Sequence, residues 1–328
     1  MGSSYKPIKN AGHDEATGYH TESTDTSSNL FIKFPSKMLS ISLAVLPFVV
    51  FYFTVPMKAE IILSNATQSR QLLPMTYDLL PLGTIKPLGW IKDQLQLEAE
   101  GLAGNLYEFY RFVKQSQWLG GEYEYSELHE SAPYWYNGLV PLAYTLDDDR
   151  LKAQVNDFLS YVLSHQAVDG WLGPETTKET RGIWARCLLL QGLMNHAIAD
   201  PTKEKTIVDA MFKYTSLANS MLKANYTGFI QQPGDDFDPY GFGVSRAHEF
   251  STTLQWLYET YPGRNDTLLW ETMELMWSAA KLANRDWTDF FVNGVFPTTA
   301  RSKGETYSMM HGVNMAEGKS LRLCVGRY

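Results

Sequence analysis

The chain has 328 residues, 44% apolar and 13% aromatic, and a formal net charge of -8 at pH 7. This apolar share supports a substantial core, so the length fits one large folded domain with a tail. The negative charge leaves no basic stripe for a nucleic-acid backbone, which argues against nucleic-acid binding. With only two cysteines, Cys187 and Cys324, the chain has no dense disulfide framework and no Cys-x-x-Cys metal pattern.

The N-terminal segment differs in character from the rest of the chain. Residues 1–38 are polar and rich in Ser and Thr, which predicts a disordered tail. Residues 39–56, LSISLAVLPFVVFYFTVP, carry no charge and would extend about 27 Å as a helix, close to the thickness of a bilayer core. Because a long polar tail precedes this stretch, we expect a retained signal anchor, not a cleaved signal peptide.

The charges and sequons flanking the anchor predict its orientation. Two lysines closely precede the anchor and one follows it, which places the N-terminus in the cytosol. Three N-glycosylation sequons, at Asn65, Asn225 and Asn265, all lie beyond the anchor, although three sequons could also arise by chance. We therefore expect a single-pass type II membrane glycoprotein whose body is lumenal or extracellular.

After a linker over residues 57–76, apolar periodicity of the helical type continues through residues 77–318, so the predicted class is all-α. The expected helices are Leu88–Glu98, Asn105–Ser116, Trp135–Leu146, Asp149–Ser164, Trp184–Ala199, Lys203–Ala224, Ala247–Tyr261 and Thr267–Asn284. Short and long connections alternate, which predicts helical hairpins in an (α/α)6 toroid, with an open solenoid as the alternative. The long loops would gather at one end and form the site there.

Acids and aromatic residues cluster at the predicted starts of helices. Glu127, His129 and Glu130 directly precede the helix that contains Trp135. If the two glutamates lay on a helix, their spacing of three would point them the same way, and glycoside hydrolysis needs two carboxyl groups about 5 to 10 Å apart. The alternative is a role in capping or in the helix dipole. Glu130, with Glu249, is therefore only a weak catalytic candidate.

Sugars stack their apolar ring faces on aromatic side chains and pair their hydroxyls with polar groups, so mixed aromatic and polar loops predict carbohydrate binding. The loop DGWLGPE has this composition, although its tryptophan could equally be a packing plug, and isolated His and Arg residues are often structural. The predicted substrate-binding residues are His129, Trp135, Trp171, Trp184, Arg186, His248, His311 and Asn314. We expect no metal site and no cofactor in this chain, because no His-x-x-x-His or His/Cys cluster is present.

Several strings together resemble the family 127 glycoside hydrolases, the β-L-arabinofuranosidase-like group. They are LPLGTIKPLGWIKDQL, ESAPYWYNGLVPLAYTLDDDRLKA, DGWLGPE and MHGVNMAEG, and they span roughly residues 77–318. The resemblance implies an (α/α)6 toroid followed by β-rich domains. It also implies a retaining mechanism with a zinc-held cysteine nucleophile and a glutamate acid/base. His311 matches a substrate-binding histidine of that family.

Departures from the family pattern limit what the resemblance implies. The family's catalytic glutamate and zinc-binding cysteines follow the motif that contains His311, whereas this chain ends 17 residues later with an aberrant tail, residues 319–328. A further active-site histidine has no match in the helix that starts at Trp184. We therefore expect a truncated, inactive chain, without zinc, forming an open arc of about eight helices with an exposed apolar edge.

Two alternatives remain open from the sequence. One is a non-catalytic carbohydrate-binding protein that kept the cavity without the chemistry. The other is an α/α-toroid lyase or hydrolase that uses its own carboxylates, Glu130 or Glu249 with Asp236.

Overall fold

The computed structural model describes residues 72–73, 77, 80–285, 287 and 311–318. All of them belong to the second of two compact units, Ser64–Tyr328. The predicted cytosolic tail, the anchor over residues 39–56, Asn65 and residues 319–328 lie outside the described residues, as does most of the linker. Within the described part of the chain, no helix is both long enough and apolar enough to cross a membrane.

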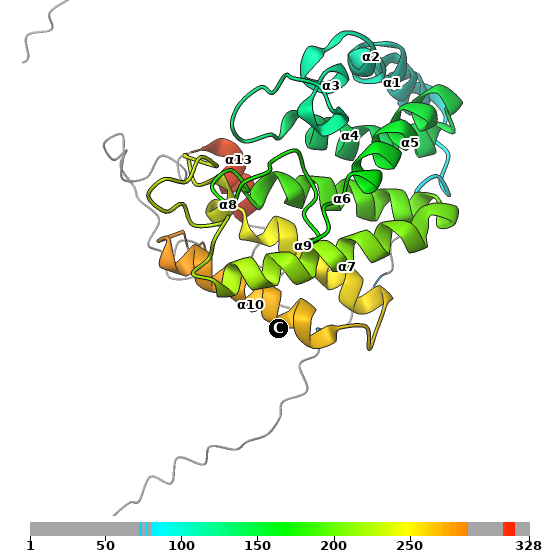
Figure 1. Cartoon of the computed structure of the whole chain (residues 1–328). Helices are drawn as coiled ribbons and strands as arrows, with labels where there is room; N and C mark the ends of the chain where they lie inside the picture. The colour runs from blue at the N-terminus through cyan, green and yellow to red at the C-terminus, as the bar shows by residue number, and fades with distance from the viewer. Residues whose placement is uncertain (1–71, 74–76, 78–79, 286, 288–310, 319–328) are drawn as a thin grey trace, which may run out of the picture. The chain divides into compact units, whose positions relative to one another are not determined.

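The all-α prediction is confirmed for the described residues, which contain helices and no strand beyond an isolated bridge between Ser116 and Tyr123. Figure 1 shows the arrangement of the helices. They are α1 (Gly89–Glu100), α2 (Leu102–Phe109), α3 (Arg111–Lys114), the 3-10 turn η1 (Gln117–Leu119), α4 (Ser131–Leu146), α5 (Asp149–Ser164), α6 (Trp184–Ala199), α7 (Pro201–Lys223), α8 (Phe242–Ser245), α9 (Ala247–Thr260), α10 (Asp266–Leu282) and α13 (Gly312–Gly318).

Most predicted helix boundaries agree with the structure within a few residues. The α5 and α6 helices begin and end where the sequence pattern places them. The single helix predicted over Asn105–Ser116 is wrong, because Tyr110 adopts an extended conformation and separates α2 from α3. The α4 helix starts four residues earlier than predicted, at Ser131.

Three helical hairpins form the body of the described chain: α4 with α5, α6 with α7, and α9 with α10. The short turns follow from local chemistry. Asp148 Oδ1 accepts a hydrogen bond from the Leu151 amide at 3.0 Å, and Asp200 Oδ1 accepts one from the Thr202 amide at 3.0 Å. These are N-cap contacts, and Pro201 at the first helical position reinforces the second turn. Since these short turns join the two helices of a pair, the first helix of each pair begins where a long loop ends.

The α6 helix is the centre of the packing, with α4 on one side and α9 on the other. Eleven of its 16 residues are buried, so it is enclosed on nearly all sides. Gly192 permits the close approach of α4, since a Cβ there would lie 2.6 Å from the Tyr136 ring. This approach brings the first turns of the hairpins near one another.

Apolar side chains are exposed along α1 and its approach. Leu88, Trp90 and Leu97 are 80%, 74% and 64% exposed. The α1 helix thus packs on α2 and α4 while presenting apolar side chains to solvent.

Candidate functional site

Two polar clusters lie near the starts of the hairpins. We call the first the Arg246 cluster, and it contains Tyr134, Trp184, Phe242, Arg246, His248, Glu249, His311, Asn314 and Glu317. We call the second the Arg186 cluster, and it contains Trp118, Glu124, His129, Trp171, Glu175 and Arg186. Because α4, α6 and α9 all begin at the long-loop end, their first turns contribute side chains to these clusters.

Aromatic rings form one wall of the Arg246 cluster. Trp184 stacks on Phe242 with ring centroids 5.2 Å apart, and Tyr134 meets Trp184 edge-on at 6.3 Å. His311 packs edge-on against Phe242 at 5.4 Å. The Arg246 guanidinium carbon lies 5.0 Å from the ring centres of both Trp184 and Phe242, a cation–π geometry that holds the charge against the wall.

Arg246 connects three separate parts of the chain. Its Nε donates a hydrogen bond to Asn314 Oδ1 at 2.7 Å, and its Nη1 donates one to Tyr134 Oη at 2.9 Å. Its Nε also lies 3.6 Å from Glu317 Oε2. The side chain is almost fully buried, so these partners replace the water that a guanidinium would otherwise bind.

The pKa values of two neighbouring carboxyl groups in this cluster are shifted in opposite directions. Burial, together with the neighbouring charge of Glu317, raises the pKa of Glu249 well above its usual range. For Glu317, burial opposes ionisation, but the contact with His248 and the charge of Arg246 outweigh it and lower the pKa. The raised pKa favours the protonated form of Glu249, and Trp184 Nε1 donates a hydrogen bond to Glu249 Oε2 at 2.8 Å.

Three buried polar atoms of the Arg246 cluster have no hydrogen-bond partner among the described residues: His248 Nδ1, His311 Nδ1 and Glu317 Oε2. Both ion contacts to Glu317 Oε2, from His248 and Arg246, are 3.6 Å long, which exceeds a hydrogen bond. Burying polar atoms without partners costs free energy, so such atoms require an explanation. The Arg186 cluster also has three such atoms, Glu124 Oε2, His129 Nδ1 and Arg186 Nε. The aromatic wall, with the partly exposed Tyr134 beside it, is what makes the Arg246 cluster the better candidate site.

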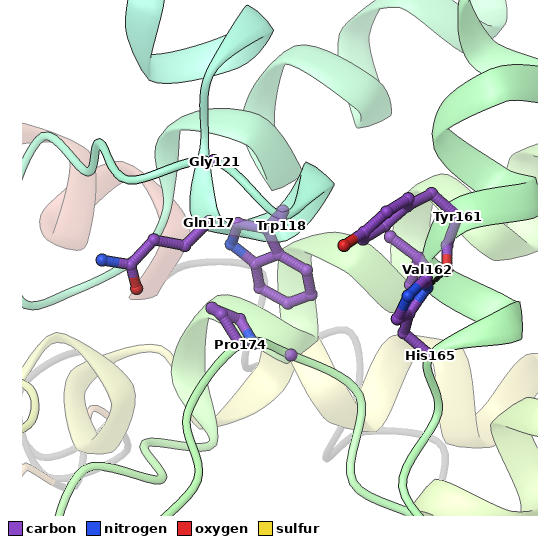
Figure 2. Close-up of a pocket in the computed structure, with 8 residues that line it drawn as sticks. Gln117, Trp118, Gly121, Tyr161, Val162, His165 and Pro174 are labelled. Atoms are coloured by element: carbon purple, nitrogen blue, oxygen red, sulfur yellow. Dashed lines mark hydrogen bonds between the residues drawn. The ribbon is translucent and has the colours of Figure 1, made fainter.

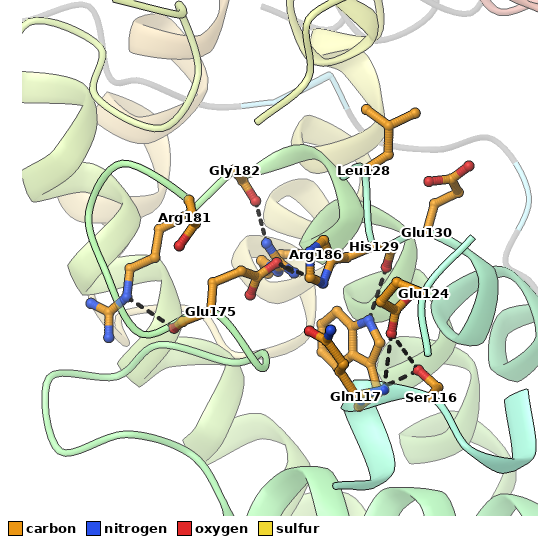
Figure 3. A network of polar contacts seen from close by, with 12 residues as sticks. Ser116, Gln117, Glu124, Leu128, His129, Glu130, Glu175, Arg181, Gly182 and Arg186 are labelled. Atoms are coloured by element: carbon orange, nitrogen blue, oxygen red, sulfur yellow. Dashed lines mark hydrogen bonds and ion pairs between the residues drawn. The ribbon is translucent and has the colours of Figure 1, made fainter. Parts of the chain in front are cut away.

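The Arg186 cluster is built around a buried ion pair (Figure 3). Arg186 Nη2 lies 2.6 Å from Glu175 Oε1, and both side chains are at most 2% exposed. The guanidinium lies between the rings of Trp118 and Trp171, at 4.9 and 4.6 Å from their centres. Glu175 Oε2 also accepts a hydrogen bond from Trp171 Nε1 at 3.2 Å. The charges are paired inside the protein, which indicates a structural role.

Glu124 and His129 border this ion pair. Burial raises the pKa of Glu124 to about 7, although Ser116 Oγ and the Gln117 amide donate hydrogen bonds to its Oε1 at 2.6 and 3.1 Å. His129 has a left-handed backbone, its Nδ1 lies 3.6 Å from Glu175 Oε1, and burial lowers its pKa. The His129 backbone carbonyl accepts a hydrogen bond from Trp118 Nε1. His129 therefore fixes the loop before α4.

The structure divides the predicted substrate-binding residues among three places. Trp184, His248, His311 and Asn314 meet in the Arg246 cluster, whereas His129, Trp171 and Arg186 belong to the Arg186 cluster. Trp135 belongs to neither cluster. It is 7% exposed, stacks on Tyr107 at 5.3 Å and meets Phe158 edge-on at 5.7 Å. Trp135 and Trp171 are thus packed in the interior.

The predicted helical pairing of Glu127 and Glu130 is not found, because both residues lie in the loop before α4. Glu130 accepts a hydrogen bond from Ser126 Oγ at 3.1 Å, and its side chain does not cap the helix. Asp236, the suggested partner of Glu249, is exposed on a loop, and Glu249 pairs with Glu317 instead. The sequon residues Asn225 and Asn265 are both exposed.

The described residues do not offer the ligand set of a zinc centre. Among the described residues, no group of three His, Cys, Asp or Glu side chains could hold a metal ion. Cys187 is fully buried, its Sγ lies 3.6 Å from the Ile183 carbonyl oxygen, and burial raises the pKa of its thiol well above the usual range. A cysteine binds zinc as its thiolate, so the raised pKa makes Cys187 unsuited to that role. Cys324 lies outside the described residues.

Comparison with known proteins adds no relative: the chain matches no protein-family model, no curated protein and no solved structure. The resemblance to family 127 glycoside hydrolases therefore rests on the sequence motifs quoted above.

Sequence reasoning omitted several members of the clusters. Glu317 lies three residues after Asn314, so helical spacing could have placed it beside Asn314 on one face of α13. Tyr134 neighbours Trp135 in sequence, but only the helix orientation decides which of the two enters the site. Trp118 and Glu124 carried no recognisable pattern, because their roles depend on contacts with distant residues.

Proposed function

We propose that this chain binds arabinofuranoside-type glycans at the Arg246 cluster, as the substrate-binding part of a glycoside-hydrolase-like protein. The proposal is carried by the Trp184–Phe242 wall and by three buried atoms beside it that have no hydrogen-bond partner among the described residues, His248 Nδ1, His311 Nδ1 and Glu317 Oε2. Sugar hydroxyls both donate and accept hydrogen bonds, so they complement imidazole nitrogens and a carboxylate oxygen. The apolar face of a sugar ring complements the aromatic wall.

The accessible part of the cluster favours binding from solvent. Tyr134 is 43% exposed, and the Glu317 side chain is 28% exposed. Arg246 and Glu249 lie behind them and are at most 5% exposed, so they position the outer groups. The His311 match to a substrate-binding histidine of family 127 supports the same location.

Binding is tested with methyl β-L-arabinofuranoside and isothermal titration calorimetry on the full chain. His311→Ala should weaken binding about tenfold, the equivalent of about 1.4 kcal/mol, because it removes one hydrogen-bonding group and one ring contact. Val313→Ala is the matched control, since Val313 is an exposed neighbour on α13. Equal affinities for the wild type and His311→Ala would refute the proposed site.

Hydrolysis by the described carboxyls is the less favoured function. Glu249 and Glu317 are close enough for each to shift the pKa of the other, whereas glycoside hydrolysis requires about 5 to 10 Å between two carboxyl groups so that substrate or water fits between them. This contact supports sugar binding without turnover by that pair. Release of the aryl group from an aryl β-L-arabinofuranoside by the purified chain, abolished in Glu249→Gln, would establish the hydrolase instead.

Three further features belong to the proposal. The hairpins would form part of an (α/α)6 toroid, residues 39–56 would anchor the chain in a membrane, and Asn225 and Asn265 would carry glycans on its lumenal or extracellular side. The exposure of both asparagines supports the last point. Membrane fractionation after carbonate washing, combined with glycosidase digestion of wild type and Asn225→Gln/Asn265→Gln, tests anchor and orientation together. A carbonate-soluble, unglycosylated chain would refute both.

A further inference from the structure

A separate pocket of about 400 Å³ lies between the last turn of α5, the η1 turn and the loop at Pro174 (Figure 2). It shares no lining residue with the Arg246 cluster. Its volume is within the range of small-molecule sites, about 300 to 1,000 Å³. From its walls we propose that this pocket binds a neutral saccharide unit.

The wall formed by η1 is held in place by hydrogen bonds. Ser116 Oγ accepts from the Trp118 amide at 3.2 Å and donates to Glu124 Oε1 at 2.6 Å. Trp118 Nε1 donates to the His129 carbonyl at 2.8 Å, and the Arg186 guanidinium covers the Trp118 ring. The ring edge at this wall is therefore fixed before any ligand arrives, which reduces the entropy cost of binding.

The loop wall at Pro174 is equally constrained. The preceding Gly173 has a φ of +146°, and a Cβ there would lie 2.5 Å from Glu175 Oε2 and 3.0 Å from Arg186 Nη2. The buried ion pair of Glu175 and Arg186 thus fixes the position of Pro174. Two rigid walls therefore face α5 across the pocket.

The α5 wall presents two polar atoms without a hydrogen-bond partner among the described residues. The rings of Tyr161 and His165 stack with centroids 3.9 Å apart and an interplanar angle of 16°. His165 Nδ1 lies 2.8 Å from the Tyr161 carbonyl oxygen and 3.1 Å from Ser164 Oγ, so Nε2 is the ring nitrogen left for a ligand. Neither His165 Nε2 nor Tyr161 Oη forms a hydrogen bond with another described residue. Figure 2 shows the Tyr161 hydroxyl directed across the pocket towards Trp118.

The lining chemistry selects the ligand class. Among the described residues that line the pocket there is no Asp, Glu, Lys or Arg, so the pocket holds no permanently charged partner for a charged ligand. Apolar surface from Val162 and Pro174 alternates with a phenol, an imidazole and the Gln117 amide. A neutral sugar ring has this mixture of apolar C–H faces and hydroxyls, whereas a purely aromatic ligand would leave the polar groups unpaired.

The test is calorimetric titration of the full chain with neutral disaccharides, namely xylobiose, cellobiose and arabinobiose, and with one uronic-acid disaccharide as the charged counterpart. We expect saturable binding of at least one neutral sugar and at least tenfold weaker binding of the charged one. Tyr161→Phe and His165→Ala should each weaken the neutral sugar about three- to tenfold. Tyr125→Phe, which removes an exposed hydroxyl outside the pocket, should change nothing.

The outcomes separate this inference from the proposed function. If Tyr161→Phe and His165→Ala weaken binding and His311→Ala leaves it unchanged, the pocket binds sugar independently of the Arg246 cluster. If only His311→Ala weakens binding, the pocket proposal is overturned while the proposed function stands. Absence of saturable binding by every neutral sugar, or tighter binding of the charged one, also overturns the pocket proposal.

Discussion

Arg246 Nε donates a hydrogen bond to Asn314 Oδ1 at 2.7 Å, although the two residues are 68 positions apart in the sequence. This contact joins the start of α9 to α13, and the same guanidinium bonds to Tyr134 at the start of α4. One side chain therefore holds together three elements of the candidate sugar site. The positions of Asn314 and Tyr134 around this side chain require a planar group with several hydrogen-bond donors, which lysine does not have.

Arg246→Lys should accordingly disrupt the site even though the charge is kept. We expect loss of the bond to Asn314 to weaken methyl β-L-arabinofuranoside binding at least tenfold and to lower the free energy of unfolding by about 1.5 to 3 kcal/mol. Calorimetry and urea denaturation measure the two effects. Arg264→Lys is the control, because Arg264 pairs with Asp209 at a partly exposed surface. Wild-type affinity in Arg246→Lys would contradict the assigned role.

The buried pair of Glu175 and Arg186 should respond strongly to removal of one charge. In Glu175→Gln, the guanidinium would remain buried between Trp118 and Trp171 without a counter-charge. Breaking a buried pair from one side typically costs about 3 to 5 kcal/mol. Urea denaturation should show a loss of this size. Asp209→Asn, in an exposed pair, should cost less than about 1 kcal/mol, and equal losses in both variants would rule out the buried-pair account.

His196 should make stability depend on pH. Its Nδ1 lies 2.8 Å from Tyr136 Oη and its Nε2 lies 3.0 Å from Tyr144 Oη, and burial lowers the pKa of the imidazole to about 4. In the unfolded chain the His196 imidazole has a pKa near 6.5, so it binds a proton more readily there than in the folded protein. The contribution of His196 to the free energy of unfolding is therefore fully present above pH 6.5. It is lost as the pH falls through about 4, by about 3 kcal/mol in total.

Urea denaturation of the wild type and of His196→Gln, from pH 7 to pH 4, checks this dependence. The quantity to compare is the difference between their unfolding free energies at each pH. The difference in unfolding free energy should shrink as the pH falls, because glutamine does not titrate. His165→Ala is the control, since His165 is exposed. A difference that stays constant over this range would show that His196 is not the group responsible.

Gly192 and Gly138 provide a matched pair of glycine substitutions. In Gly192→Ala the new Cβ would lie 2.6 Å from the Tyr136 ring and force α4 and α6 apart, which should cost about 1 to 3 kcal/mol. Gly138 lies in α4 with nothing within 4 Å of a Cβ, so Gly138→Ala should stabilise by about 0.5 to 1 kcal/mol. Thermal or urea unfolding should therefore shift in opposite directions. Destabilisation by both substitutions would contradict the described helix contact.

The helices could be read from the sequence because their signals are local. Apolar spacing predicted the bounds of α5 and α6 and came within two residues of those of α7, and the structure shows that Asp148 and Asp200 cap α5 and α7. The break at Tyr110 was missed, since an unbroken apolar pattern does not reveal a change in one backbone conformation. The positions of polar residues at helix starts were likewise visible, and four of the eight predicted binding residues meet in the Arg246 cluster.

The sequence by itself determined the all-α class, most helix boundaries and the concentration of polar and aromatic residues at the hairpin starts, because these depend on neighbours a few positions apart. Only the tertiary structure decided that Trp135 is packed in the interior while Tyr134 reaches the site, and that Glu249 pairs with Glu317. Burial and protonation depend on contacts between residues far apart in the chain. Helix orientation and long-range packing set those contacts, and they leave no mark in local spacing.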